Sequence, residues 1–191
     1  MAKTQYLVAA SIDGFIADTD NSLEWLFEAE ARATKDAQTA REEQFRQFFT
    51  ATGAMTMGAT TYEWVVEHED LLTNPAQWHE YYGQVPCWVF THRKLPVVPG
   101  ANVSFVSGGV RPVYDQMRVA AEGRNLWVVG GGELAGQFAD LGLLDQIILT
   151  VAPVTLGAGA PLLPRRLTAA QLTLTGCSHD GTFASFTYTL A

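Results

Sequence analysis

The sequence has no long hydrophobic run, few cysteines and little positive charge. No apolar segment approaches the roughly 18 residues that a membrane-spanning helix needs. Cys87 and Cys177 have no paired spacing, and the four histidines lack the spacing of metal ligands, so the sequence predicts neither a disulfide framework nor a metal site. No signal peptide opens the chain, and we therefore expect a cytoplasmic protein.

Positive charge is scarce, because 12 lysines and arginines stand against 20 aspartates and glutamates, which gives a formal net charge of −8. This balance argues against nucleic acid and anionic membranes as partners. An anionic small molecule could bind only where cations gather locally. The chain has 191 residues, 48% of them hydrophobic, and no internal repeat or linker, so we expect residues 1–191 to form one domain with a sizeable core.

What the chain does have is a strand–helix–strand pattern centred on glycines at residues 125–149. A short apolar run ends in Gly130, Gly131 and Gly132, and an amphipathic helix then runs up to Gly142. A turn without β-carbons lets backbone N–H groups approach a ligand, and the positive end of the helix dipole lies beside it. The pattern suits the phosphates or ribose of a nucleotide; a tight turn that needs glycine for its shape is the alternative.

Two named nucleotide motifs do not match these glycines. A Walker loop needs a lysine after its glycines, and none follows here. A Rossmann fingerprint needs an acid about 20 residues further on, at the end of the next strand. That strand instead ends in Val151, Ala152 and Pro153.

A second strand–glycine–helix junction lies at Gly58. Residues 54–57 are typical of a buried strand, and Thr60 with Glu63 fits a capping box that opens a helix. The densest cationic cluster of the chain, residues 91–94 (Thr-His-Arg-Lys), follows another short strand. It is either a solvated turn or a clamp for a phosphate monoester such as the 2′-phosphate of NADP.

The remaining pattern indicates the fold class. Strands alternate with helices up to residue 151, including a helix over 38–50 whose Arg41 is expected to face water. Residues 155–164 are typical of a glycine- and proline-rich loop, and the chain closes with alternating strands that predict a hairpin. We predict a three-layer αβα domain with a mixed sheet, parallel in the centre and antiparallel at the C-terminal edge.

Four motifs in this order resemble the dihydrofolate reductase-like superfamily: residues 11–17, 57–63, 128–134 and 152–157. The closer match is the branch that holds the reductase domain of the bifunctional riboflavin-pathway deaminase–reductase. The resemblance covers nearly the whole chain and implies an NADPH-dependent reductase. By this resemblance the cofactor would be held by Ala9 and Ile16 beside the nicotinamide, Gly58, Ala59 and Thr60 at the pyrophosphate, Thr91 and Arg93 at the 2′-phosphate, and Gly131, Gly132, Glu133 and Leu134 along the pyrophosphate and nicotinamide ribose.

The sequence also departs from the superfamily pattern. Classical dihydrofolate reductases usually carry arginine where this chain has Ala59, so the 2′-phosphate would rest more on His92, Arg93 and Lys94. Those enzymes place one acid in the first helix, whereas here several acids lie near that place and none is a clear match. No deaminase domain precedes the reductase-like region, so a role in riboflavin synthesis would be that of a separate reductase.

We expect hydride transfer to a C=N or C=O carbon of a small heterocycle, either pterin-like or similar to 5-amino-6-(5-phosphoribosylamino)uracil. The first candidate for the proton donor is Asp13, which follows the first expected strand and is alternatively a turn former; Glu24 is the second. Arg165 and Arg166 either contact a substrate phosphate or form a solvated pair.

Two rival functions stay open: a non-catalytic nucleotide-binding or sensor protein on the same fold, and a flavin-binding oxidoreductase. Apolar edge strands and the resemblance predict a homodimer.

Overall fold

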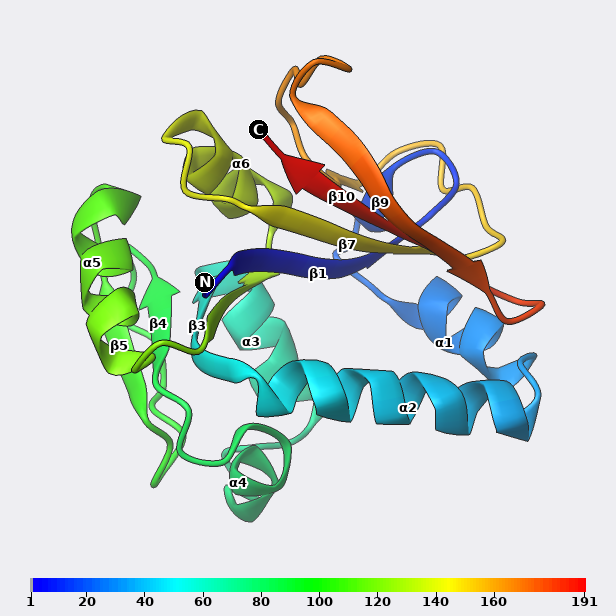
Figure 1. The fold of residues 1–191 in the computed structure, drawn as a ribbon. Coiled ribbons are helices and arrows are strands. Elements are labelled where there is room, and N and C mark those ends of the chain that lie inside the picture. Colours follow the sequence, from blue (N-terminus) through cyan, green and yellow to red (C-terminus); the bar gives the residue numbers. More distant parts are fainter. Residues whose placement is uncertain (1) are drawn as a thin grey trace.

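The protein is described over residues 2–191 by a computed structural model, in which helices cover both faces of a mixed sheet (Figure 1). In chain order its elements are β1 (Thr4–Ala10), β2 (Phe15–Ala17), α1 (Glu24–Ala31), α2 (Lys35–Thr50), β3 (Thr52–Gly58), α3 (Ala59–His68), α4 (Ala76–Tyr82), β4 (Cys87–Phe90), β5 (Val103–Val106), α5 (Val110–Ala120), β6 (Asn125–Gly130), α6 (Gly132–Asp140), β7 (Gln146–Val151), β8 (Ala160–Pro161), β9 (Leu172–His179) and β10 (Ala184–Leu190).

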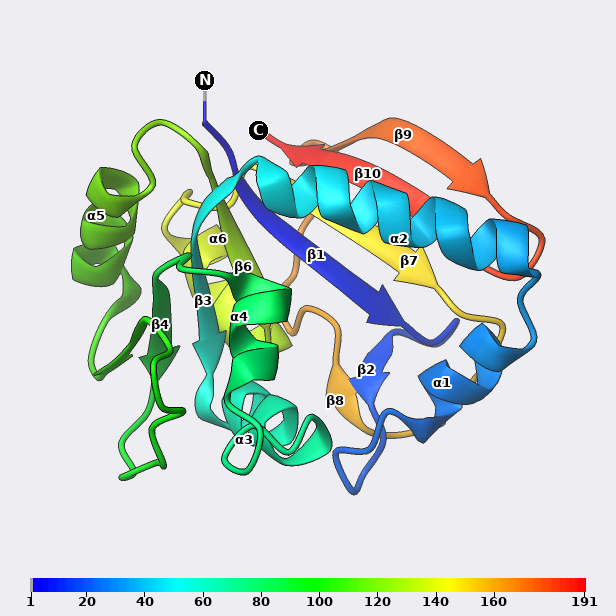
Figure 2. The ribbon, with the colours of Figure 1, turned by 90° about the horizontal axis from the view of Figure 1, so that it is seen from below.

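The main sheet has eight strands in the order β5-β4-β3-β6-β1-β7-β10-β9. Neighbouring strands from β5 to β7 run parallel, whereas β10 pairs antiparallel with both β7 and β9. In Figure 2 helices α2 and α4 lie in front of this sheet and α6 lies behind it. The predicted fold, parallel in the centre with an antiparallel hairpin at one edge, is confirmed.

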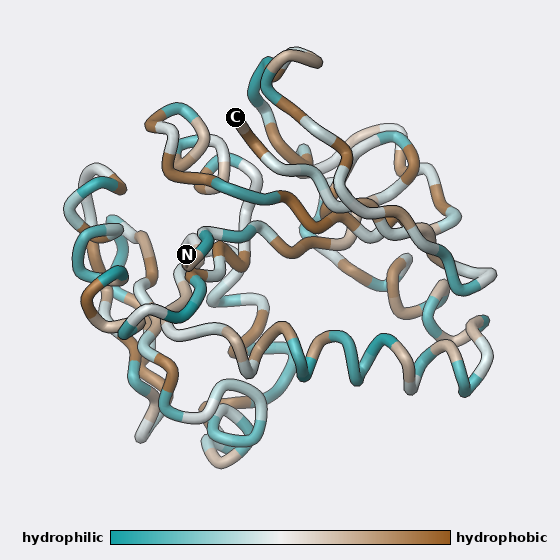
Figure 3. The backbone as a smooth tube through the Cα atoms, viewed as in Figure 1, coloured by the Kyte–Doolittle hydropathy of each residue, from teal (hydrophilic) through white to brown (hydrophobic). Residues whose placement is uncertain are grey.

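Side chains that alternate along the central strands supply two separate cores. On β6, Leu126 and Val128 pack with α5 and α6, while Trp127 between them packs on the opposite face with α2, α3 and α4. Because both faces are covered, most residues in the middle of these strands are apolar. Along β1 and β7 the chain changes from hydrophilic at the strand start to hydrophobic further on (Figure 3).

Helix α2 starts three residues before the predicted helix, since the Thr34 hydroxyl accepts a hydrogen bond from a backbone N–H of its first turn. Its Phe48 and Phe49 meet Trp127 of the sheet edge-on, with ring centroids 5.6 and 6.2 Å apart. These aromatic contacts fix the helix against the sheet.

Arg41 on α2 does not face water as predicted. Its guanidinium forms an ion pair with Glu30 at 2.7 Å and a second one with Asp180, and it lies 4.5 Å from the centroid of the Phe183 ring. Asp180 belongs to the β9–β10 turn, so one arginine connects α1, α2 and the C-terminal hairpin. Its partners belong to two other elements, with Asp180 lying 139 residues further along the chain, and they gave no local sequence signal.

Two further local predictions were wrong. The segment predicted as a loop contains β8, which forms a small antiparallel sheet with β2 through the pairs Phe15 with Pro161 and Ala17 with Ala160. The capping box does not form either, because α3 begins directly after the strand, at Ala59. The carboxylate of Glu63 instead binds a guanidinium, that of Arg93.

The sheet opens between β1 and β6 toward their carboxyl ends. β1 pairs with β6 from Thr4 to Tyr6, but with β7 as far as Ala10. The chain turns into α6 directly after Gly130, so the last residues of β1 have a free edge on that side. This opening provides room for a site at the ends of the parallel strands.

Candidate functional site

A cavity of about 850 Å³ lies at the carboxyl ends of the parallel strands. Ligands of open α/β sheets bind outside these ends, where the order of the strands reverses. Here the chain runs outward from β3 through β4 to β5 and returns on the other side of β3 as β6, so the reversal falls between β3 and β6. The five strand ends from β5 to β1 contribute Ser107, Phe90, Gly58, Gly130 and Ala9 to the lining.

Three helices begin beside this cavity, each directly after a glycine. The N-caps of α3, α5 and α6 are Gly58, Gly109 and Gly131, and none of the three has a side-chain cap. The first backbone N–H groups of a helix have no partner within the helix. Three sets of such donors, each with the positive end of a helix dipole, therefore point to one region that suits phosphate oxygens.

The third junction was missed by the sequence analysis. Ser107 and Gly108 line the cavity, and Gly108-Gly109 stands between β5 and α5 in the same strand–glycine–helix pattern as the other two junctions. The pattern itself was a usable signal, because a glycine pair follows a short apolar strand and precedes an amphipathic helix.

The glycines that line the cavity have two different structural roles. A β-carbon added to Gly58 or Gly131 would meet nothing closer than 3.8 Å, so their lack of a side chain is not required by protein packing. At Gly132 the added carbon would lie 2.2 Å from the carbonyl oxygen of Pro161. Gly132 thus serves the contact between α6 and β8, whereas Gly58 and Gly131 leave backbone surface open to a ligand.

The cationic cluster lies at one end of the cavity. Thr91 and His92 line the cavity itself, and they also border a smaller hollow of about 310 Å³ that contains Arg93 and Lys94. The guanidinium of Arg93 donates two hydrogen bonds to the carboxylate of Glu63, at 2.9 and 2.5 Å. The cluster is therefore joined to the cavity, and its arginine is held by an exposed ion pair.

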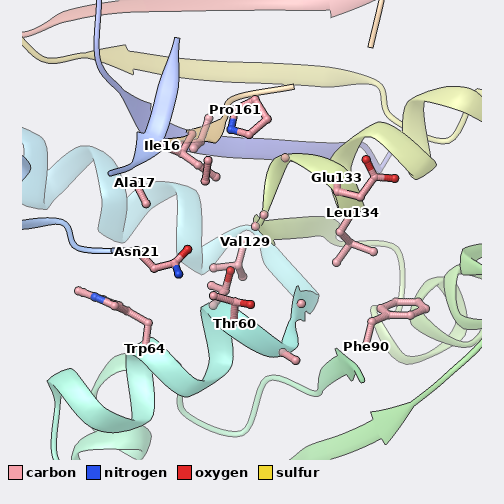
Figure 4. A pocket seen from close by; sticks show the side chains of 18 of the residues that line it. Ile16, Ala17, Asn21, Thr60, Trp64, Phe90, Val129, Glu133, Leu134 and Pro161 are labelled. Atoms are coloured by element: carbon pink, nitrogen blue, oxygen red, sulfur yellow. The ribbon is translucent and has the colours of Figure 1, made fainter. Parts of the chain in front are cut away.

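The other end of the cavity is mostly apolar, with Asn21 as a polar member. Figure 4 shows Ile16, Ala17, Asn21 and Trp64 on the side away from Phe90, which precedes the cationic cluster. Leu23 and Leu26 also line the cavity. Thr60 lies between the two ends in the same view, at the start of α3.

Glu133 and Leu134 follow the glycines of α6 and both line the cavity. The carboxylate of Glu133 accepts hydrogen bonds of 2.7 and 2.9 Å from Arg165, which also binds Asp140. The hydrogen bonds from Arg165 lower the pKa of Glu133, so this side chain stays ionised at neutral pH. Its carboxylate is occupied by the protein, and Arg165 is held by two acids at the surface.

The two acids predicted as proton donors, Asp13 and Glu24, do not belong to the cavity lining as described over residues 2–191. The carboxylate of Asp13 accepts hydrogen bonds from the Ser11 hydroxyl at 2.6 Å and from the backbone N–H of Gly157 at 2.7 Å and of Leu156 at 3.1 Å. The Ser11 hydroxyl, followed by the Gly157 N–H, lowers the pKa of Asp13 to about 2. Asp13 therefore holds two loops together as an anion, and Glu24 is exposed at the start of α1.

Most of the predicted cofactor residues come together around the cavity. Its lining includes Ala9, Ile16, Gly58, Ala59, Thr60, Thr91, His92, Gly130, Gly131, Gly132, Glu133 and Leu134. Arg93 lies in the adjoining hollow. The sequence analysis did not identify the apolar end, because Asn21, Leu23, Leu26 and Trp64 belong to no glycine or charge motif.

Within the described part of the chain, residues 2–191, no three His, Cys, Asp or Glu side chains are grouped to hold a metal ion. Cys87 is buried and Cys177 is exposed, and both are free thiols. Over the same residues, no helix combines the length and the apolar character needed to span a bilayer.

The sequence matches known proteins over nearly its whole length. Residues 2–184 match the family described as the RibD C-terminal domain. The uncharacterized protein YwjB of Bacillus subtilis (strain 168) is 30% identical over 189 residues, which is 99% of this chain and 98% of YwjB.

Solved structures share the fold. A Shewanella sp. PV-4 protein named for riboflavin biosynthesis has a TM-score of 0.75 and 21% identity, with 100% of this chain and 99% of that chain covered. The diaminohydroxyphosphoribosylaminopyrimidine deaminase/5-amino-6-(5-phosphoribosylamino)uracil reductase of Thermotoga maritima has a TM-score of 0.64 and 15% identity, with 100% of this chain and 57% of that chain covered. At these identities the likeness shows a common fold.

Proposed function

The chain belongs to the RibD C-terminal domain family, and on this premise we propose that it is an NADPH-dependent reductase of a small heterocyclic compound with a C=N or C=O bond. The observation that carries the proposal is the meeting of three uncapped, glycine-initiated helices and a cationic cluster at one cavity. A dinucleotide needs several separate sites for its phosphates, and this arrangement offers them.

The residues fit the parts of NADPH in order along the cavity. Ala59 and Thr60 would donate backbone N–H groups to the pyrophosphate from the start of α3, and Gly131 would let the chain approach it closely. Thr91, His92 and Arg93 would hold the 2′-phosphate at the cationic end. Ile16 and Ala9 would border the nicotinamide toward the apolar end.

When bound, NADPH would supply a hydride, with its two electrons, to the carbon of the substrate's C=N or C=O bond. The nitrogen or oxygen of that bond must gain a proton to complete the reduction to an amine or an alcohol. Because Asp13 and Glu24 lie outside the lining and Glu133 is held as an anion by Arg165, we assign this proton to water that enters the cavity. The contribution of the protein is then to position the substrate and the cofactor.

The experiment begins with cofactor binding, followed by turnover. NADPH is titrated against the protein with tryptophan fluorescence as the signal, and its oxidation is then followed with pterins, phosphoribosylamino-uracil and simple cyclic carbonyls. We expect saturable binding and loss of the nicotinamide absorbance with at least one compound. A protein that does not bind NADPH at millimolar concentration would contradict the proposal.

A variant at Gly58 sharpens this test. The backbone of Gly58 is extended, with φ of −79°, and an added β-carbon meets nothing within 3.8 Å, so Gly58→Val should fold normally. Its side chain would enter the space assigned to the pyrophosphate, and NADPH affinity should fall about tenfold or more. An unchanged affinity with an unchanged melting temperature would remove Gly58 from the cofactor site.

The second candidate function is a nucleotide-binding sensor on the same fold. It is favoured by the position of Asp13 and Glu24, which leaves the lining without an acid that could donate a proton near the apolar end. Tight NADPH binding without turnover of any compound in the panel would support the sensor. A yellow protein after purification would point instead to a bound flavin.

A further inference from the structure

The apolar end of the cavity has a wall of fixed orientation, formed by Trp64 of α3. Its indole stacks on the ring of His68, with centroids 4.5 Å apart and an interplanar angle of 15°. Phe27 of α1 stacks on His68 in turn, with centroids 4.9 Å apart and an angle of 4°. Because two other rings hold it, Trp64 offers a flat apolar surface with little freedom to move.

Asn21 places a polar group at this end. Its backbone has a φ of 60°, which few residues other than glycine adopt and which asparagine tolerates. The loop is fixed by Asp18, whose backbone oxygen accepts from the Asn21 N–H at 3.2 Å. The Asp18 carboxylate accepts from the N–H groups of Asp20 and Ser22 at 2.9 and 2.8 Å. Figure 4 shows the Asn21 amide pointing into the cavity.

The charged side chains of the cavity lie elsewhere. Over residues 2–191, the lining contains no lysine or arginine, and its titratable members, His92 and Glu133, belong to other parts of the lining. Arg165 is engaged by Glu133 and Asp140. A phosphate at the apolar end would therefore lose its hydration without a cation to replace it, which is costly.

We infer that the substrate is an uncharged, planar ring compound without a phosphate group. This inference rests on the proposed function and selects among the substrates considered for it. The ring packs against Trp64, and Leu23 and Leu26 cover its apolar part. The Nδ2 of Asn21 donates a hydrogen bond to the carbonyl oxygen or ring nitrogen, which orients the C=O or C=N carbon for hydride transfer.

In this scheme Asn21 and Trp64 determine specificity. The hydride from NADPH reduces the carbon, and NADPH becomes NADP⁺. A proton from water completes the product and leaves hydroxide, so that a hydride and a proton, together two electrons and two protons, are added to the substrate. Asn21 keeps its protons throughout.

The test compares matched compounds and matched variants. The compounds are 5-amino-6-ribosylamino-uracil with and without its 5′-phosphate, together with uncharged pterins and cyclic carbonyls. Asn21→Gly removes the amide and suits the φ of 60°. Trp64→Leu removes the flat aromatic surface. Trp64→Phe keeps a flat ring at the same place and is the control. The Kd for NADPH and the melting temperature are measured for every variant.

We expect an uncharged compound to have the highest kcat/KM, at least about tenfold above that of any phosphorylated one. Asn21→Gly and Trp64→Leu should each lower kcat/KM on it about tenfold or more, with the NADPH Kd within about twofold of wild type and substantial recovery in Trp64→Phe. A phosphorylated compound as the best substrate, above all one whose turnover falls on Arg166→Ala, would overturn the inference. The inference would also be overturned if kcat/KM on uncharged substrates did not change in Asn21→Gly and Trp64→Leu. NADPH binding without turnover of any uncharged compound would overturn it as well. Absence of NADPH binding would instead remove the proposed function and the inference with it.

Discussion

Arg93 lies beside the cavity in a bidentate ion pair with Glu63, and both side chains are partly exposed to solvent. An exposed ion pair of this kind contributes little to stability. The guanidinium of Arg93 can therefore leave Glu63 and bind a more highly charged anion at little cost in stability. A dianionic 2′-phosphate at the cationic end of the cavity would be such an anion.

Arg93→Glu should therefore weaken NADPH binding about 10- to 100-fold, the size expected for a lost charge-assisted hydrogen bond. NADH lacks the 2′-phosphate, so its Kd should change by no more than about twofold. Glu63→Gln should act in the opposite direction and tighten NADPH, because it frees the guanidinium. The Kd values come from fluorescence titration, with Arg46→Glu on α2 as the control for charge. Equal effects on both nucleotides would remove Arg93 from the phosphate site.

Asp13 gives a prediction about pH. Its folded-state pKa of about 2 lies below the ordinary 3.8, so the carboxylate contributes stability above about pH 4, and this contribution is lost as the pH falls toward 2. Asp13→Asn should lower the melting temperature at pH 7, and the difference from wild type should disappear near pH 2. A difference that is constant with pH would contradict the account. A loss of kcat without a change in melting temperature would restore Asp13 as the proton donor.

At the scale of elements, the start of α6 and strand β8 are joined through Gly132. Its α-carbon faces the carbonyl oxygens of Pro161 and Leu162 so closely that a β-carbon would lie 2.2 and 2.5 Å from them. The contact sets the position of β8, and Pro161 lines the cavity. The wall of the site on this side thus depends on one glycine.

Gly132→Ala should destabilise the protein by about 1–3 kcal/mol, because the backbone must move to accept the methyl group. Gly109 offers a matched control at the start of α5, since an added β-carbon there meets nothing within 4 Å and φ is −74°. Gly109→Ala should cost less than about 1 kcal/mol. Urea unfolding measures both. Equal free energies of unfolding for the two variants would contradict this prediction, because β8 would then have moved to accept the methyl group without loss of stability.

The sequence predicted those elements whose signal is local. The central strands were identified because both of their faces are buried, and α2 because Phe48 and Phe49 follow Phe45 at helical spacings of three and four. The β2–β8 sheet was missed, since its strands have three and two residues and its pairing joins Phe15 to Pro161. Arg41 was predicted to face water, because no local pattern shows that its two acidic partners come from other elements.

The residues of the candidate site also divide into those with a local sequence signal and those without one. Glycines and clustered charges are visible as motifs, and Gly58, Gly131 and Thr91 were found by them. Asn21 and Trp64 are single residues in otherwise ordinary segments, and the fold alone brings them to one cavity. Asp13 was predicted to lie beside the nicotinamide but is not part of the cavity lining, and its position after a strand does not reveal that the backbone N–H of Gly157, 144 residues further along the chain, binds the carboxylate.

At the scale of the whole molecule, β9 is an edge strand of the main sheet, and its Leu174 is 52% exposed. Exposed edge strands with apolar side chains pair readily with another chain. We propose on this basis that the protein is a homodimer in solution. The contact would include β9 and leave the cavity, at the carboxyl ends of the parallel strands, open to ligands.

Light scattering after size exclusion should therefore give twice the chain mass of 20.8 kDa. Leu174→Lys should shift the protein toward the monomer. Val119→Lys is the control, because Val119 is an exposed apolar residue of α5, remote in the strand order from β9. A mass of one chain for the wild type at micromolar concentration would contradict the proposal.

The central claim is that three helix starts and the cationic cluster hold one dinucleotide. The backbone N–H groups at residues 59–61, 110–111 and 132–134 begin α3, α5 and α6 and have no partner within their helices; residue 112 is proline and has no N–H. Hydrogen exchange with and without NADPH measures them directly. We predict that binding slows exchange at all three helix starts and at Thr91–Lys94 together. Protection at one helix start alone, or at none despite binding, would contradict the account.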